Sequence, residues 1–362
     1  MDEGCTTPLI VPVFMPHAGC PHRCVFCDQR SVTGKPPAIP DAKHIDRAME
    51  IYANEPNDRP VQIAFYGGNF LGLPKNTIRS LLAAATRFVA AGRADGIRFS
   101  TRPDTISDER LALMGNYPVS IVEIGAQSMS DRVLAQSRRG HLACDTIQAV
   151  ERLDAFGYQT GVQMMIGLPG DDIKTVLCTG RKIAALAPAF VRIYPTIVLA
   201  GSPLGRLYAK GQYHPLDLAA AVDLTKQLLV LFHGYHIPVI RMGLQASAEL
   251  DTGSSVMAGP YHPAFGHLVY DALFFDAVMT GLGTDPPGDA IDIFVHSRNI
   301  SKMRGLSNRN IQQLTDHFHP RRITVGTDDS IDLDSVVVNG HSRRLYGKNS
   351  GDAGIGAKLS CV

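Results

Sequence analysis

The feature that most constrains the fold is an alternation of short apolar segments with amphipathic ones along the first half of the chain. The apolar segments are strand candidates and cover Leu9–Phe14, Val61–Phe65, Ile97–Ser100, Val119–Ile124, Gln159–Met165 and Phe190–Tyr194. Helical periodicity fills the intervals, over Ala42–Ala53, Asn76–Ala91, Asp108–Asn116, Leu142–Phe156 and Asp172–Leu186. Near-continuous apolar strands separated by helices indicate a parallel sheet covered by helices, and therefore an α/β fold.

Polar motifs follow nearly every one of these strands. Barrel folds assemble their sites from the loops at the carboxyl ends of their strands. Six strand–helix units with such loops therefore favour a partial (β/α)6 TIM-like open barrel over a flat doubly wound sheet. Asp41, Ser107 and Asp171 are expected to cap the starts of helices. Gly92 and Gly157 stand where helix C-terminal glycines are expected.

The rhythm of strands and helices breaks near residue 245, and we place a domain boundary there, between residues 1–245 and 246–362. The stretch after it is punctuated by Gly and Pro and contains one clearly helical piece, His267–Thr280. Further strands are expected at Ala290–His296 and Ile323–Gly326. The sequence thus predicts a smaller C-terminal α/β domain behind the barrel.

Residues 290–331 of that domain follow the order strand, helix, short loop, helix, strand. The loop Arg304-Gly305-Leu306-Ser307-Asn308 resembles the GXXG loop of a KH-like RNA-binding unit, with Asn308 in place of the second Gly. Asn accepts the positive φ that such a position needs. Local positive charge comes from Lys302, Arg304, Arg309, Arg321 and Arg322. An ordinary α/β cap over the barrel mouth explains the same segment, so both interpretations stay open.

Three cysteines, Cys20, Cys24 and Cys27, follow the first predicted strand at a C-x3-C-x2-C spacing. This spacing suits a [4Fe–4S] cluster in which one iron has no protein ligand. A structural zinc site and chance clustering are the alternatives. Structural zinc is usually closed by four ligands, and only His17 or His22 offers a fourth one nearby.

Later strand ends carry polar residues in otherwise apolar surroundings. They are Gly67-Gly68-Asn69, Ser100, Glu123 with Gln127, Arg138-Arg139, and Gln163 ahead of Gly167-Leu168-Pro169-Gly170. A Gly pair lets the backbone approach a ligand closely. Buried polar side chains need hydrogen-bond partners, so Glu123 and Gln127 are expected in a site. An Arg at a helix end either complements the helix dipole or clamps a carboxylate.

Taken together, these motifs resemble those of the radical S-adenosylmethionine (radical SAM) enzymes. The three-cysteine run is similar to the superfamily's signature, and the order of the other motifs matches over residues 8–245. The oxygen-independent coproporphyrinogen III oxidase-like proteins are one similar subgroup. The other is the radical domain of the elongator-complex catalytic subunit, a modifier of the tRNA wobble uridine. No acetyltransferase-like segment follows these motifs, so an acetyl-CoA activity is not expected.

The resemblance implies two cofactors and a role for each motif. Cys20, Cys24 and Cys27 would ligate a [4Fe–4S] cluster whose fourth iron binds the methionine end of S-adenosylmethionine. The expected S-adenosylmethionine contacts are Phe26 and Leu168 beside the adenine, Gly67, Gly68 and Asn69 at the amino group, and Ser100, Gln127, Arg139 and Gln163 around the ribose and carboxylate. Ser100 and Gln163 stand where relatives often have an acidic residue.

The implied reaction is cleavage of S-adenosylmethionine to a 5′-deoxyadenosyl radical, which abstracts hydrogen from a substrate that the sequence does not identify. RNA, tRNA included, leads a tetrapyrrole or other small molecule because of the KH-like segment. A non-catalytic iron–sulfur or haem-binding protein is the alternative from another class. A flavodoxin- or ferredoxin-like electron donor is also implied.

Composition adds two expectations. The formal net charge of +1 gives no overall footprint of a polyanion binder, although local patches are compatible with it. No apolar run approaches about 18 residues, and the N-terminus lacks a basic region. The sequence therefore predicts a cytoplasmic protein with no membrane partner.

Overall fold

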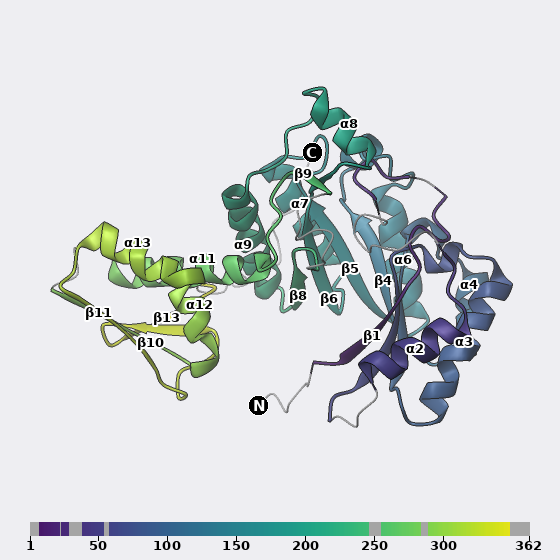
Figure 1. The fold of residues 1–362 in the computed structure, drawn as a ribbon, viewed down its shortest axis with the longest axis horizontal. Helices are drawn as coiled ribbons and strands as arrows, with labels where there is room; N and C mark the ends of the chain where they lie inside the picture. Colours follow the sequence, from purple (N-terminus) through teal and green to yellow (C-terminus); the bar gives the residue numbers. More distant parts are fainter. Residues whose placement is uncertain are drawn as a thin grey trace. The chain divides into compact units, whose positions relative to one another are not determined.

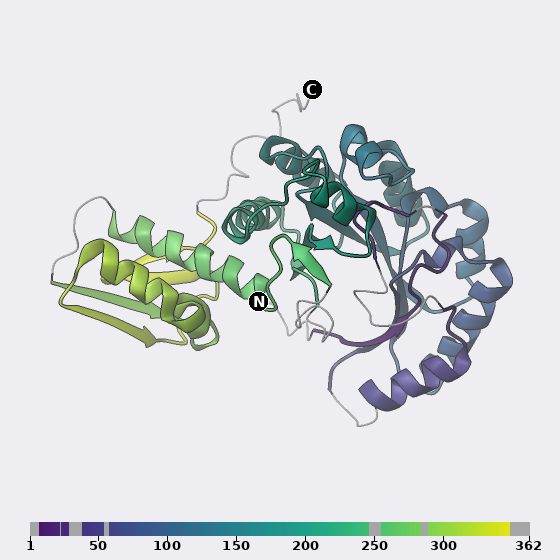
Figure 2. The same cartoon turned by 45° about the horizontal axis from the view of Figure 1, so that its top comes forward.

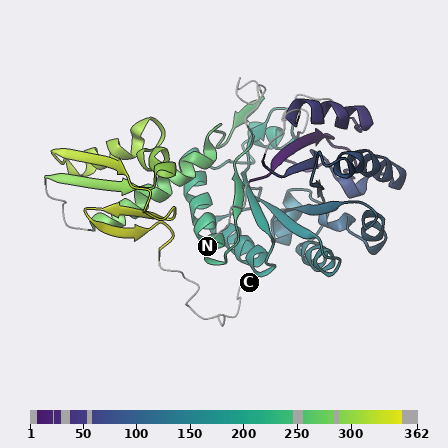
Figure 3. The same cartoon turned by 90° about the horizontal axis from the view of Figure 1, so that it is seen from below.

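The computed structural model describes residues 7–21, 23–28, 38–53, 58–245, 255–283 and 289–347. The chain forms two compact units (Figures 1–3). The first contains residues 1–215 and 245–259, and the second contains residues 216–244 and 260–362. The units interleave along the chain, whereas the sequence suggested a single boundary near residue 245.

The larger sheet is a curled half-barrel with helices on its outer side (Figure 3). Its strands are β1 (Leu9–Phe14), β2 (Val61–Tyr66), β3 (Gly96–Thr101), β4 (Val119–Gln127), β5 (Gln159–Ile166), β6 (Phe190–Pro195) and β8 (Val239–Met242), in the order β1-β2-β3-β4-β5-β6-β8. Strands β1 to β6 each pair in parallel with the next. The predicted partial TIM-like barrel is confirmed.

Helices fill the intervals between these strands. They are α2 (Ala42–Tyr52), α3 (Lys75–Ala90), α4 (Asp108–Met114), α5 (Asp131–Gln136), α6 (Ala143–Ala155), α7 (Ile173–Ala185) and α8 (Pro203–Ala209). Helices α2, α3, α4, α6 and α7 correspond to the five predicted helical segments, whereas α5 and α8 were not predicted. A short antiparallel pair, β7 (Val198–Leu199) and β9 (Val256–Ala258), completes the unit.

Two of the three predicted N-caps are confirmed. The Asp41 side chain accepts a hydrogen bond from the His44 backbone, and the Ser107 side chain accepts one from the Arg110 backbone. The third prediction was wrong by one residue, because Asp172 rather than Asp171 caps α7 by accepting from the Thr175 N–H. Both residues are Asp, so the residue type does not distinguish them.

The two faces of the half-barrel differ in character because strand side chains alternate between faces. The face under the helices is apolar and at most 2% exposed at Val11, Val13, Ile63, Phe65, Ile97, Phe99, Val122, Ile124, Val162, Met164, Val191 and Ile193. The alternate positions carry polar side chains, and we call this set the concave face: Gln62, Tyr66, Arg98, Ser100, Glu123, Gln163, Arg192 and Tyr194. Register brings them together, since Ser100 pairs with Glu123 and Gln163 with Arg192.

The second unit contains a smaller sheet with helices on one side (Figure 2). Its helices are α9 (Leu218–Gly234), α11 (Phe265–Leu282), α12 (Ile300–Arg304) and α13 (Arg309–Phe318). Its strands are β10 (Ala290–Val295), β11 (Arg322–Thr327), β12 (Ser335–Val338) and β13 (His341–Arg344), in the order β11-β10-β12-β13. Strand β10 is parallel to β11 and antiparallel to β12. Ile291, Ile293 and Val295 are fully buried on alternate positions of β10.

The loop between α12 and α13 has the backbone conformation that its sequence predicts. Gly305 has φ 75° and Asn308 has φ 62°, and positive φ values are those that Gly and Asn tolerate best. The Leu306 N–H donates to the Asp271 carboxylate at 2.8 Å. That amide already has an anionic partner inside the protein, and the KH-like assignment stays a prediction.

Within the described part of the chain, no helix is both long enough and apolar enough to cross a membrane.

Candidate functional site

The cysteine-containing loop starts at the carboxyl end of β1 and is held against the loop after β2. The Met15 N–H donates to Tyr66 O at 2.8 Å and the His17 N–H donates to Gly67 O at 2.9 Å. Cys20 is exposed, Cys24 is buried and Cys27 is intermediate. An open hollow surrounds Cys20 and is lined by Gly19, Pro21, Gly72, Thr105 and Arg110. The loop therefore presents one thiol outward and one inward.

The Gly67-Gly68-Asn69 motif fits tightly against the cysteine loop. A Cβ on Gly68 would lie 2.5 Å from Ala18 O, so only Gly fits there. Asn69 is fully buried and its Nδ2 donates to Gly19 O at 2.9 Å. Its Oδ1 accepts from the Thr101 hydroxyl at 2.7 Å, and also from the Arg102 N–H and the Thr105 hydroxyl. Asn69 thus ties together the loops after β1, β2 and β3. Its contact with the amino group of S-adenosylmethionine stays a prediction.

Arg139 connects the cysteine loop to β4. Its Nη1 lies 3.1 Å from Cys24 Sγ and its Nη2 donates to Gly125 O at 2.5 Å. Arg139 is 7% exposed, and its Nε has no hydrogen-bond partner among the described residues. Burial raises the pKa of the Cys20 thiol and the neighbouring Cys24 raises it further, while Arg139 and Arg102 oppose this. The pKa of Cys20 is raised overall, and both guanidinium groups act against this rise, in favour of the thiolate that binds metal.

Two glutamines predicted to contact the ribose or carboxylate lie together at the ends of neighbouring strands. Gln163 Nε2 donates to Gln127 Oε1 at 3.2 Å. Gln127 has φ 67°, an unusual value for a residue other than Gly, at an irregularity in the β4–β5 pairing. Ser100 lies in register with Glu123 on the same face. The structure thus brings these residues together on and just above the concave face.

Phe26 and Leu168, the two residues predicted beside the adenine, belong to one apolar group. Phe26 and Tyr194 pack against a buried cluster of Val133, Met165 and Leu168. The turn that contains Leu168 is held from outside, because the Tyr213 hydroxyl donates to Gly167 O at 2.5 Å. These residues form an apolar wall of the kind a flat ring needs, and the contact with adenine stays a prediction.

The sequence pointed to Glu123 but missed the charged residues around it. Glu123 Oε1 accepts from Arg98 Nε at 2.9 Å, from Arg98 Nη2 at 2.6 Å and from the Tyr66 hydroxyl at 2.7 Å. Its other oxygen lies 3.0 Å from Arg192 Nε. Arg98 and Arg192 each interrupt an apolar strand, between Ile97 and Phe99 and between Val191 and Ile193. A polar residue in an otherwise apolar strand is also the pattern that indicated Glu123, so the same pattern would have indicated Arg98 and Arg192.

The three thiols fit an iron–sulfur cluster better than a single metal ion. Among the described ranges, no three His, Cys, Asp or Glu side chains are arranged to hold one ion. Thiolates of a four-iron cluster bind different irons and need not converge on one point. The guanidinium at Cys24 Sγ suits an anionic sulfur ligand. Of the proposed fourth zinc ligands, His22 lies outside the described residues.

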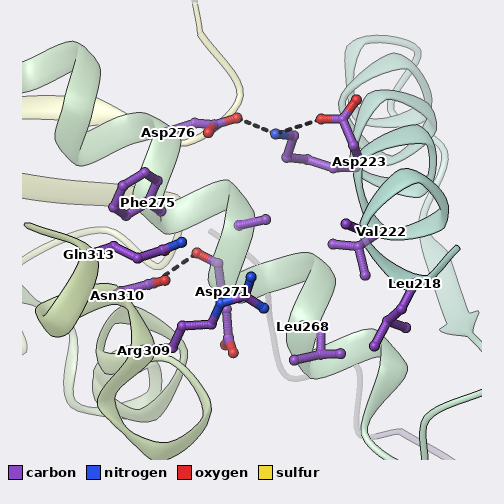
Figure 4. Close-up of a pocket in the computed structure, with 13 residues that line it drawn as sticks. Leu218, Val222, Asp223, Leu268, Asp271, Phe275, Asp276, Arg309, Asn310 and Gln313 are labelled. Atoms are coloured by element: carbon purple, nitrogen blue, oxygen red, sulfur yellow. Dashed lines mark hydrogen bonds and ion pairs between the residues drawn. The ribbon is translucent and has the colours of Figure 1, made fainter. Parts of the chain in front are cut away.

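The second unit has a cavity of its own, of about 330 Å³, between α9, α11 and α13 (Figure 4). Its apolar wall is formed by Leu218, Val222, Leu268, Ala272 and Phe275. Lys226 also lines it, and its Nζ lies 3.0 Å from Asp223 and 2.5 Å from Asp276. The charge of Lys226 is therefore satisfied within the protein.

Comparison with known families decides between the interpretations of the cysteine motif. Residues 15–179 match the family model described as the Radical SAM superfamily, and residues 188–274 match the Radical_SAM C-terminal domain. The chain belongs to the radical SAM superfamily of enzymes. The cofactors of this radical SAM protein are a [4Fe–4S] cluster and S-adenosylmethionine, as predicted.

Individual relatives of this radical SAM protein agree with the resemblance seen in the sequence. An uncharacterized protein of Methanocaldococcus jannaschii is 28% identical over 223 residues, which are 58% of this chain and 68% of that protein. A tRNA uridine(34) acetyltransferase of Methanocaldococcus infernus is 24% identical over 257 residues, 59% of this chain and 48% of the relative. This chain therefore spans about half the length of that acetyltransferase.

A solved structure is similar in fold. The archaeal Methanocaldococcus infernus Elp3 with an N-terminal deletion superposes with a TM-score of 0.55 at 20% sequence identity. The superposition covers 74% of this chain and 63% of that chain. At this level of identity the comparison shows a shared fold.

Proposed function

We propose that this protein cleaves S-adenosylmethionine reductively and uses the resulting radical to abstract hydrogen from an RNA substrate, with tRNA as the leading candidate. The observation that carries the proposal is the three-cysteine loop at the carboxyl end of β1, with Arg139 directed at Cys24. When bound, the cluster and S-adenosylmethionine together supply a 5′-deoxyadenosyl radical. All the remaining work belongs to the protein: binding, orienting and excluding water.

The surrounding residues have separate tasks in this proposal. Phe26 and Leu168 provide the apolar wall for the adenine. Arg139 holds Cys24 in place, and its free Nε is available to a carboxylate. The Gln127–Gln163 pair offers amide groups to the ribose. The exposed edge at Cys20 gives a flavodoxin- or ferredoxin-like donor short access to the cluster.

The proposed substrate class rests on relatives. The chain is 24% identical to tRNA uridine(34) acetyltransferases of two Methanocaldococcus species. The matched region is 59% of this chain and about half of each relative. RNA is therefore preferred to a tetrapyrrole as the substrate.

The test is anaerobic reconstitution with iron and sulfide, reduction, and addition of S-adenosylmethionine with and without bulk tRNA. We expect 5′-deoxyadenosine to form and its rate to rise with tRNA. A fully loaded cluster that gives no 5′-deoxyadenosine would overturn the enzyme proposal and favour a non-catalytic iron–sulfur protein. Formation of 5′-deoxyadenosine that tRNA does not change, with no nucleoside altered in the tRNA, would overturn the substrate proposal alone.

A further inference from the structure

We propose that the concave face of the half-barrel binds an oxyanion of the substrate, a phosphate or a carboxylate, on the guanidinium of Arg192. The inference rests on the proposed function only in taking this oxyanion to be part of the substrate. The anion site itself follows from the charges and hydrogen bonds of the described residues.

The charged side chains on the concave face do not balance. Arg98 is 2% exposed, Glu123 is 3% exposed and the Arg192 side chain is 15% exposed. Two cations thus face one carboxylate in a largely dry interior. Among the described residues, Arg98 and Arg192 both form their ion pairs with Glu123. A buried charge without a counter-charge is costly, so binding of one anion would balance the set.

The tyrosine in the network does not supply that missing charge. Burial raises the pKa of Tyr66, and the neighbouring Glu123 raises it further. The phenol therefore stays protonated and donates its hydrogen to Glu123 at 2.7 Å. The net charge of the three ionised groups, Arg98, Arg192 and Glu123, remains one positive unit.

The two guanidinium groups differ in how many of their hydrogen-bond donors have partners. All three nitrogens of Arg98 have partners, Glu123 for Nε and Nη2 and Gln62 for Nη1. Arg192 differs. Among the described residues, its Nε lies 3.0 Å from Glu123 Oε2 but makes no hydrogen bond, its Nη2 donates to the Tyr66 hydroxyl at 3.0 Å, and its Nη1 donates only to the Tyr194 hydroxyl at 3.5 Å. A guanidinium has five N–H donors, so Arg192 has donors left for an oxyanion.

Arg192 lies close to the predicted S-adenosylmethionine contacts. Arg192 is in register with Gln163, one of the predicted S-adenosylmethionine contacts. Two residues further along β6, Tyr194 packs against the cluster that contains Leu168 and Phe26. An oxyanion on Arg192 would therefore lie on the same face as the predicted adenosine site. It would hold a substrate at the place where the radical forms.

The experiment compares thermal unfolding of the full-length protein in chloride, inorganic phosphate and acetate at matched ionic strength. We expect phosphate or acetate to raise the unfolding temperature of the wild type. Arg192→Gln should weaken the apparent affinity for that anion roughly tenfold or more, since charge-assisted hydrogen bonds are lost. Arg87→Gln is the matched control, because Arg87 is 59% exposed and forms a surface pair with Asp46. It should respond as the wild type does.

Glu123→Gln changes the response in the opposite direction. It leaves two buried cations without a carboxylate, so the added anion should stabilise this variant more than the wild type. If only one of the two anions, phosphate or acetate, raises the unfolding temperature, that result identifies the oxyanion that the site binds. Equal responses of wild type, Arg192→Gln and Arg87→Gln would overturn the site. The unfolding experiment does not depend on the 5′-deoxyadenosine assay. Anion binding can therefore be judged even if no 5′-deoxyadenosine forms.

Discussion

Each unit contains a set of three charged side chains that do not balance, and the two sets differ in sign and in exposure to solvent. In the second unit, Lys226 lies between Asp223 and Asp276, whose side chains are 56% and 54% exposed. In the first unit, Glu123 lies between Arg98 and Arg192 with every side chain at most 15% exposed. Each set has three charges and an imbalance of one.

Water makes the difference between the two sets. Solvent screens the surplus carboxylate beside Lys226, so that arrangement is a weak surface contact. The surplus cation on the concave face has no such screening and needs a partner. The comparison indicates that the concave face is built for a ligand, whereas the Lys226 contact belongs to the surface of its own unit.

The largest effect is expected at the cysteine loop that serves this face. Cys24→Ala should remove the iron–sulfur absorption and reduce 5′-deoxyadenosine formation to background, because the cluster loses one of three protein ligands. Cys144→Ala is the control, since Cys144 is an exposed free cysteine on α6. The measurement is iron and sulfide content together with product. A full cluster in Cys24→Ala would show that the ligands are assigned incorrectly.

Next comes the stability of the buried network. Glu123→Gln should lower the free energy of unfolding in chloride by about 3–5 kcal/mol, the usual result of removing one partner of a buried ion pair. Urea unfolding followed by circular dichroism measures it. A loss below about 1 kcal/mol would mean that the buried network behaves like a surface contact and that the comparison is wrong.

A smaller effect is expected in the dependence of stability on pH. Burial raises the pKa of Asp171 to about 7, and one of its carboxylate oxygens has no hydrogen-bond partner among the described residues. A raised carboxyl pKa stabilises the fold below the unfolded value near 3.9, and this contribution is lost as pH rises through about 7. The unfolding free energy should therefore fall between about pH 4 and 7 in the wild type and level off above that, and Asp171→Asn should lack that part of the fall.

Asp223 of the second unit should behave in the opposite sense. Burial alone would raise its pKa, but hydrogen bonds from Lys226 and Gln227 outweigh this and lower it. Its contribution is present above the unfolded value and is lost at acid pH. A titration in which Asp223→Asn removed the fall between about pH 4 and 7 would contradict the assignment to Asp171.

The smallest effect belongs to the surface pair. Asp276→Asn should change the free energy of unfolding by about 0–1 kcal/mol, because the Asp276 carboxylate is mostly exposed and Lys226 keeps Asp223 as a partner. The same urea experiment measures it beside Glu123→Gln. Equal losses in the two variants would remove the contrast between the units.

Much of the fold could be predicted because it depends on local pattern. The six strands of the first unit follow from apolar runs, and Asp41 and Ser107 cap helices as their residue types predict. Helices α5 and α8 were missed, whereas the similarly short α4 was predicted with Ser107 at its start. The β12–β13 hairpin was also missed, although its turn, Asn339-Gly340 with φ 49° and 81°, is the commonest signal for a tight hairpin.

The site was only partly predictable for a different reason. The three cysteines are close together in the sequence, and the glycine pair directly follows a strand. The positions of both motifs therefore follow from the topology of the sheet. The partnership of Arg98, Glu123 and Arg192 depends on strand register across three different strands, which the sequence does not contain. Asn69 is similar, since its role as a junction appears only when three loops meet.

The most direct test of the account is electron paramagnetic resonance of the reduced, reconstituted protein before and after S-adenosylmethionine is added. In the proposed cluster three cysteine ligands leave one iron open, so the cofactor should bind that iron and change the spectrum of the cluster. The same change should be absent in Cys24→Ala, which has no intact cluster. A fully loaded cluster whose spectrum stays the same at saturating S-adenosylmethionine would contradict the claim that this loop presents an open iron to the concave face.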